Sequence, residues 1–213
     1  MPAKFSKPQA TQTLPPAGIH AAIDRLAAAI SKRHPPAQRR GSALYESASG
    51  LTSKIELPSE ATGSHRKSKI PSPLLILGIA NGGVVLARRL AAKIPGARPG
   101  VLDISFHRDD IGRHPIPKEF APTHIPADVN NATIILVDDV LQSGRTTNAA
   151  LNEIFDHGRP ARVELAVLVD RGGRRLPIAA DYAGLMLAAA DDEKIHLHID
   201  PENPSRDAME IKN

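Results

Sequence analysis

Cysteine and tryptophan are both absent from the 213-residue sequence, and the other aromatic residues are few, with four phenylalanines and two tyrosines. Without cysteine the chain can form neither a disulfide bond nor a thiolate metal site, which is typical of a protein kept in a reducing compartment. Single-stranded RNA is commonly bound on stacked aromatic side chains, so this composition argues against such a platform.

Long uninterrupted hydrophobic runs are absent as well. The longest apolar stretch, LLILGIANGGVVLA, is broken by a polar asparagine and two glycines and is too short to span a bilayer. The first residues, MPAKFSKPQATQTLPPAG, lack the apolar block of a signal peptide. We therefore expect a cytoplasmic protein without membrane contact. Its formal charge of +4 permits phosphate or nucleic-acid partners without requiring them.

The N-terminal third differs in pattern from the rest of the chain. Residues 1–13 are predicted to form a disordered tail. Residues 14–33 are predicted to form a helix, because their apolar positions recur on one face: Ile19, Ile23, Leu26 and Ile30. Residues 34–70 are rich in serine, proline, glycine and basic residues, and they cannot bury enough apolar surface to offset the entropy of ordering. We expect a flexible basic insertion there, in preference to an RNA-binding arm.

Short apolar runs alternate with helical patterns from residue 71 onward. PLLILGI, TIILVDD and VELAVLVD are almost continuously apolar, as expected of strands covered on both faces. VLDISFH, YAGLMLA and KIHLHI are further candidate strands, and GVVLARRLAAKI and TTNAALNEIFDHG read as helices. This alternation predicts an α/β domain over residues 71–200, with a mainly parallel central sheet flanked by helices. A C-terminal tail is expected at residues 201–213.

One strand-to-helix junction, TIILVDDVLQSGRTTNAAL, carries the strongest functional pattern. Asp138 and Asp139 emerge at the carboxyl end of the strand, where ligands bind in parallel sheets. Two adjacent carboxylates repel each other, so they suit a ligand with paired hydroxyl groups, or a hydrated Mg²⁺ that such a ligand brings. Gly144 and the hydroxyl residues around it precede a helix whose first N–H groups suit a phosphate dianion. A sugar phosphate would satisfy both features.

These patterns have three other possible interpretations. An N-capped helix after an ordinary strand accounts for the hydroxyl residues but not for the two acids. A P-loop NTPase requires G-x-x-x-x-G-K-[ST] upstream, and the sequence contains no such motif. His196 and His198 would share one face of a strand and could bind a metal, but no third ligand is evident nearby, so an exposed strand face is preferred.

The stretch IILVDDVLQSGRT resembles the PRPP-binding signature of the type I phosphoribosyltransferases. LDISFHRDD, DHGRP and LAVLVDRGGRRLPIAADYAG further resemble the PyrR family, whose members regulate pyrimidine operons by binding RNA and also act as uracil phosphoribosyltransferases. The similarity extends from about residue 74 to residue 190. It implies a type I phosphoribosyltransferase fold with a small hood over the sheet, and a homo-oligomer.

The resemblance also implies roles for individual residues. Asp138 and Asp139 would hold the ribose hydroxyls of PRPP and, indirectly through PRPP and water, the Mg²⁺ cofactor. Together with Arg108, which would contact PRPP or its pyrophosphate, they would form the catalytic set. Arg171 and Val140 would bind the base. The pyrophosphate loop and the phosphate loop supply the other residues expected to bind PRPP: Asn81, Gly82, Gly83, Val140, Leu141, Gln142, Ser143, Gly144, Arg145, Thr146 and Thr147.

Two main functions remain open at this point. The first is an enzyme that makes UMP and pyrophosphate from PRPP and uracil. The second is a non-catalytic regulator that binds the leader RNA of a pyrimidine operon and senses UMP or UTP in the same pocket. A phosphoribosyltransferase for another base is a further alternative. Gly82 stands where many family members carry a basic residue, which slightly favours the regulator, whereas the complete VDDVLQSGRTT favours the enzyme.

Overall fold

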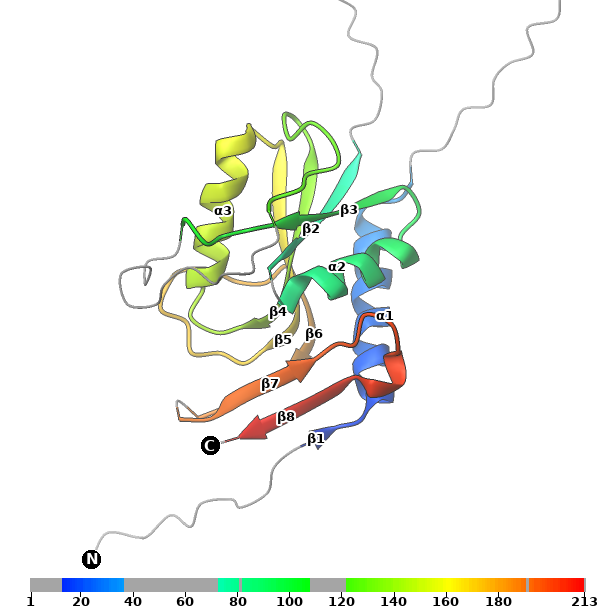
Figure 1. The fold of residues 1–213 in the computed structure, drawn as a ribbon, viewed down its shortest axis with the longest axis vertical. Helices are drawn as coiled ribbons and strands as arrows, with labels where there is room; N and C mark the ends of the chain where they lie inside the picture. The colour runs from blue at the N-terminus through cyan, green and yellow to red at the C-terminus, as the bar shows by residue number, and fades with distance from the viewer. Residues whose placement is uncertain (1–12, 37–72, 81, 108–121, 191, 213) are drawn as a thin grey trace, which may run out of the picture.

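The computed structural model describes residues 13–36, 73–80, 82–107, 122–190 and 192–212 (Figure 1). A five-stranded sheet in the order β3-β2-β4-β5-β6 forms its centre, and every neighbouring pair in it is parallel. The strands are β2 (Leu74–Ile79), β3 (Ala97–Leu102), β4 (Thr133–Leu141), β5 (Arg162–Asp170) and β6 (Tyr182–Met186). The predicted α/β fold with a parallel central sheet is confirmed.

The apolar sequence of β4 follows from its place in the middle of the sheet. Ile135 and Val137 point into a core on one face, whereas Ile134 and Leu136 point into a second core on the other face. All four side chains are fully buried. A strand covered on both faces needs apolar residues at every position, which is why the run is continuous rather than alternating. The polar residues appear only where the strand leaves the core.

Helices cover the two faces of the sheet unequally (Figure 1). The N-terminal helix α1 (Pro16–Arg33) and helix α2 (Gly82–Lys93) pack on one face, and α3 (Arg145–His157) packs on the other. The apolar positions predicted for the first helix are all buried: Ile19, Ile23, Leu26 and Ile30. The amphipathic pattern therefore located both the helix and its buried face.

A small antiparallel sheet stands beside the carboxyl ends of the central strands. It has the order β1-β8-β7, with β1 (Thr13–Leu14), β7 (Lys194–His198) and β8 (Ala208–Lys212), and a short 3-10 helix η1 (Pro204–Arg206) precedes β8. In Figure 1, β7 and β8 lie below the ends of β4 and β5. This small sheet lies where the hood was expected, and its strand β7 lines the cavity at the end of β4.

The C-terminal residues differ from the tail expected at 201–213. Strand β8 pairs with β7 along its whole length, from His198 opposite Ala208 to Lys194 opposite Lys212. The buried carboxylate of Asp207 accepts hydrogen bonds from Arg89 of α2 and from the backbone N–H of Asp200. These long-range contacts, rather than local apolar patterning, hold the segment in the domain.

The strand expected from VLDISFH ends early, at Leu102. Asp103 Oδ1 accepts hydrogen bonds from the N–H of Ser105 at 2.9 Å and from its hydroxyl at 2.5 Å, which turns the chain out of the sheet. Most of the expected tail at 1–13 and most of the expected insertion at 34–70 lie outside the described residues. Within the described residues no helix has the length and apolar character needed to cross a membrane.

Candidate functional site

A cavity of about 380 Å³ lies at the carboxyl end of β4. Its walls come from β4 and the loop after it, from the first turn of α3, from the residue after β5 and from β7. The lining residues are Asp138, Asp139, Val140, Leu141, Gln142, Ser143, Gly144, Thr146, Thr147, Arg171, Lys194, Ile195 and His196. The cavity thus lies where open parallel sheets bind their ligands.

The two acids enter this cavity from the end of the buried strand. Asp138 is only 6% exposed, and its Oδ1 accepts a hydrogen bond from the N–H of Asp139 at 3.0 Å. Asp139 Oδ1 in turn accepts from the N–H of Val140 at 2.7 Å. Burial, and then the adjacent Asp139 carboxylate, raise the pKa of Asp138 well above its usual value. A ligand that carried hydroxyl groups or a cation would stabilise the paired carboxylates, so the pair is a candidate binding site.

The start of α2 lies directly against these acids. A Cβ atom added to Gly82 would come within 2.2 Å of Asp139 Oδ2, and one added to Gly83 would come within 2.2 Å of the carbonyl oxygen of Val137. Only glycine allows the two elements to approach so closely. The predicted pyrophosphate loop and the acid pair are therefore side by side. A basic side chain at Gly82 would have to displace Asp139.

The phosphate loop turns sharply into α3. Gly144 has φ of +88° and ψ of −2°, a left-handed conformation that glycine adopts without strain. Gly144, at the N-cap position of α3, has no side chain to cap the helix, and the neighbouring Ser143 Oγ accepts a hydrogen bond from the N–H of Arg145 at 3.3 Å. The N–H groups in the first turn of a helix attract anions, and Thr146 and Thr147 bring hydroxyl donors to the same wall of the cavity. These features are the ones that the sequence prediction of a phosphate site requires.

Two buried polar atoms in the cavity wall lack partners. Within the described part of the chain, Thr147 Oγ1 and Arg171 Nε make no hydrogen bond, although Thr147 is 3% exposed and Arg171 is 6% exposed. The other end of the Arg171 guanidinium donates to the carbonyl oxygen of Ala190 at 2.8 Å. An unsatisfied buried polar atom carries a desolvation cost, so a ligand group that bonded to either atom would remove that cost.

The structure gathers most of the predicted site residues around one cavity. Only Arg145 of the described phosphate loop is not among the lining residues, although it begins α3. Gly82 adjoins the cavity residue Asp139, and Gly83 lies against the backbone of Val137 and of the cavity residue Asp138. Asn81 and Arg108 lie outside the described residues, so their roles remain predictions.

Sequence reasoning missed the contribution of β7. The face of KIHLHI that carries His196 and His198 is exposed, as predicted, but Lys194 and His196 on that face also line the cavity, together with Ile195. The alternation of the strand shows which residues share a face, but not that this face lies opposite the acid pair.

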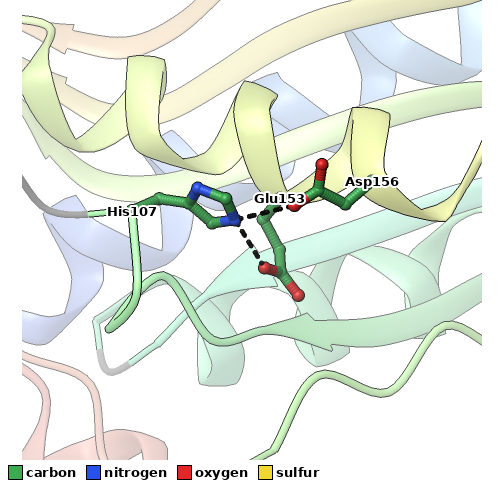
Figure 2. A group of neighbouring side chains, drawn as sticks. All are labelled: His107, Glu153 and Asp156. Atoms are coloured by element: carbon green, nitrogen blue, oxygen red, sulfur yellow. Dashed lines mark ion pairs between the residues drawn. The ribbon is translucent and has the colours of Figure 1, made fainter.

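A second polar cluster joins the end of the described stretch after β3 to α3. His107 Nε2 lies 3.2 Å from Glu153 Oε2 and 3.1 Å from Asp156 Oδ2. Figure 2 shows the imidazole directed toward both carboxylates of α3. Glu153 Oε1 also accepts the hydroxyl of Thr123 at 2.6 Å. The three side chains are close enough to share a metal ion, but the contacts of the imidazole with the two carboxylates already account for their arrangement. The cluster attaches the residue before Arg108 to α3.

Comparison with known proteins agrees with this geometry. The phosphoribosyl transferase domain family matches residues 61–200. A protein named Bifunctional protein PyrR from Ralstonia nicotianae is 48% identical over 130 residues, which cover 61% of this chain and 75% of the relative. The protein of the same name from Corynebacterium glutamicum is 47% identical over 150 residues, covering 68% of this chain and 77% of the relative.

A solved structure supports the fold independently. The hypoxanthine-guanine phosphoribosyltransferase of Bacillus anthracis aligns with a TM-score of 0.54 over 88% of this chain and 85% of its own, at 16% identity. At that identity the likeness establishes the fold alone. From the domain match and the identity to its relatives, this chain belongs to the PyrR family of type I phosphoribosyltransferases.

Proposed function

We propose that the protein transfers the phosphoribosyl group of PRPP to uracil, giving UMP and pyrophosphate. The observation that carries the proposal is a single cavity in which an acid pair, the buried Asp138 and the half-buried Asp139, adjoins the N-terminus of α3. A ribose with free hydroxyls and a 5′-phosphate presents the complementary groups on one molecule. The bifunctional relatives support uracil rather than a purine as the acceptor base, because the structural likeness to purine enzymes establishes only the fold.

The proposal gives each part of the cavity one portion of the substrate. The 5′-phosphate lies at the start of α3, where it accepts hydrogen bonds from the loop amides and from the Thr147 hydroxyl. The ribose hydroxyls lie against Asp138 and Asp139. The base extends toward Val140 and Arg171, whose Nε then gains an acceptor. Arg108 contacts the pyrophosphate in this scheme.

The reaction needs no protein nucleophile. N1 of uracil forms a bond to the anomeric carbon as the bond from that carbon to pyrophosphate breaks, and the N1 proton is lost to solvent. Positive charge develops on the ribose ring, so the carboxylates of Asp138 and Asp139 stabilise it from close by. The loop amides hold the sugar phosphate in place, so that PRPP and uracil react in a fixed relative orientation instead of by random encounter.

The donor set of the site fits a hydrated Mg²⁺. Magnesium is commonly held by one or two carboxylates together with phosphate oxygens of the substrate, and Asp138 and Asp139 supply two adjacent carboxylates. Burial raises the pKa of Asp138, and a nearby cation would favour its ionised form again. When bound with PRPP, the ion supplies neutralising charge for the departing pyrophosphate.

Family membership supports a second function, the nucleotide-dependent binding of pyrimidine operon leader RNA by a cytoplasmic homo-oligomer. In this scheme UMP or UTP occupies the same cavity. Two of the three basic residues of α2 are paired, Arg89 with the buried Asp207 and Lys93 with Asp24, so Arg88 is the exposed cation that remains on this helix for RNA. We therefore place the transfer reaction first.

Release of pyrophosphate from PRPP and Mg²⁺ tests the proposal. We expect release when uracil is added, and little release with hypoxanthine, guanine or orotate. Turnover with a purine but not with uracil would refute the base assignment. A gel shift of the pyrimidine operon leader RNA, with and without UMP, tests the second function separately.

A further inference from the structure

The segment after β5 binds the back of the phosphate loop. The carbonyl oxygen of Leu141 accepts a hydrogen bond from the N–H of Arg171 at 3.1 Å. The carbonyl oxygen of Ser143 accepts two, from the N–H groups of Arg175 and Leu176, each at 3.0 Å. The carbonyl groups of Leu141 and Ser143 therefore face this segment rather than the cavity.

One side chain in the segment joins these contacts. The guanidinium of Arg174 donates to four backbone carbonyls: Leu141 at 3.3 Å, Gln142 at 2.9 Å, Gly172 at 3.2 Å and Ile178 at 2.9 Å. Its third nitrogen donates to Asp170 Oδ2 at 2.5 Å. All three nitrogens of the guanidinium therefore donate hydrogen bonds. Two of the acceptors, the carbonyl oxygens of Leu141 and Gln142, lie at the phosphate loop.

Asp170 holds the guanidinium in this position. The side chains of Arg174 and Asp170 are 25% and 11% exposed, so the ion pair is largely shielded from water. Burial opposes ionisation of Asp170, but hydrogen bonds from Arg174 and from the N–H of Gly172 outweigh it and lower its pKa. The carboxylate stays charged at neutral pH, and it orients a fork of donors toward the loop.

The planarity of the peptide bond links these contacts to the cavity. The C=O and N–H of a trans peptide unit point in opposite directions. Fixing the carbonyls of Leu141 and Gln142 on the Arg174 side turns the N–H groups of Gln142 and Ser143 to the opposite side. Building on the proposed function, we propose that Arg174 is a positioning residue: it aims the amides of the phosphate loop at the 5′-phosphate without touching the substrate itself.

A positioning role predicts that shape matters as well as charge. Lysine at position 174 keeps the positive charge and can still pair with Asp170, but a single ammonium cannot bind two loop carbonyls and Ile178 together. Arg174→Lys is therefore expected to behave like Arg174→Ala. The matched control is Arg159→Ala, because Arg159 also donates to two carbonyls, those of Phe155 and Gly158, at the opposite end of α3.

Amide hydrogen exchange of the ligand-free protein measures the loop directly. Arg174→Ala and Arg174→Lys are expected to speed exchange in the peptide covering residues 141–147 by about tenfold, and Arg159→Ala should leave it unchanged. Because Arg174→Ala leaves a shielded carboxylate unpaired, the double variant Asp170→Asn, Arg174→Met is measured alongside. Unchanged exchange in all three Arg174 variants would overturn the inference.

Steady-state kinetics separates this inference from the proposed function. Both single Arg174 variants should raise the KM for PRPP by about tenfold with a smaller effect on kcat, because a misaligned loop weakens phosphate binding first. A wild-type KM in Arg174→Lys would overturn the role of the fork. Faster exchange in these variants, combined with no turnover of any base by the wild-type protein, would refute the proposed function while upholding the role of Arg174.

Discussion

Replacing Thr147 with valine should stabilise the protein and weaken its binding of PRPP. The Thr147 hydroxyl is buried, with 3% of the residue exposed, and Thr147 Oγ1 has no hydrogen-bond partner among the described residues. Valine has nearly the same shape without the hydroxyl. Since an unpaired buried hydroxyl costs about 1–3 kcal/mol, Thr147→Val is expected to raise the free energy of unfolding by about 1 kcal/mol.

The effect on the ligand has the opposite sign. A hydrogen bond from a hydroxyl to a phosphate dianion is charge-assisted and contributes about 1.5–3 kcal/mol, so its loss should weaken binding of PRPP by about 10- to 100-fold. Titration calorimetry with PRPP and Mg²⁺, in the absence of uracil, measures the affinity, and differential scanning calorimetry measures the stability.

Thr133→Val is the control for this substitution. Thr133 begins β4 at the amino end of the strand, far along the same element from the cavity. Its replacement should leave the affinity for PRPP unchanged. A Thr147→Val protein that binds PRPP as tightly as the wild type, or one that is less stable, would refute the assignment of this hydroxyl to the phosphate.

Three further changes test other parts of the structure. Gly82→Ala places a methyl group within 2.2 Å of Asp139 Oδ2 and should lower kcat/KM more than tenfold, with little change in melting temperature. Asp138→Asn should raise the melting temperature at pH 7. The raised pKa of Asp138 means that the folded state holds its proton more tightly than the unfolded state, so stability falls as the pH rises above the pKa of the unfolded state. The gain from the substitution should vanish under acid conditions, where Asp138 is protonated in both the folded and the unfolded state. Burial opposes ionisation of Glu164, but hydrogen bonds led by that from Tyr182 hold its pKa at about 2, compared with the usual 4.5. Its contribution of about 3 kcal/mol is complete above pH 4.5 and is lost as the pH falls toward 2, so acid denaturation of Glu164→Gln should lack this step.

The central strands and the phosphate loop could be predicted from local sequence because one physical cause dominates there. A strand covered on both faces must be apolar throughout, so the run that ends at Val137 identifies β4, and the two acids that follow it identify the edge of the core. The glycine and hydroxyl residues before α3 similarly have few uses other than a turn and an anion site.

The remaining parts depend on contacts between distant segments. The strand β8 is short, and it stays in the domain because Asp207 is bound by Arg89 from α2. The role of Arg174 depends on carbonyl groups more than thirty positions earlier in the chain, at Leu141 and Gln142. No local pattern reports such pairs, which explains why these features emerged only from the folded structure.

Calorimetric titration of the wild-type protein and of the variant Asp138→Asn, Asp139→Asn with PRPP and Mg²⁺ tests the central claim most directly. Both side chains keep their size in this variant, so the change removes charge and little else. We predict that the wild type binds and that the folded variant loses about a hundredfold in affinity. Equal binding by the two proteins would contradict the assignment of the acid pair to the ribose.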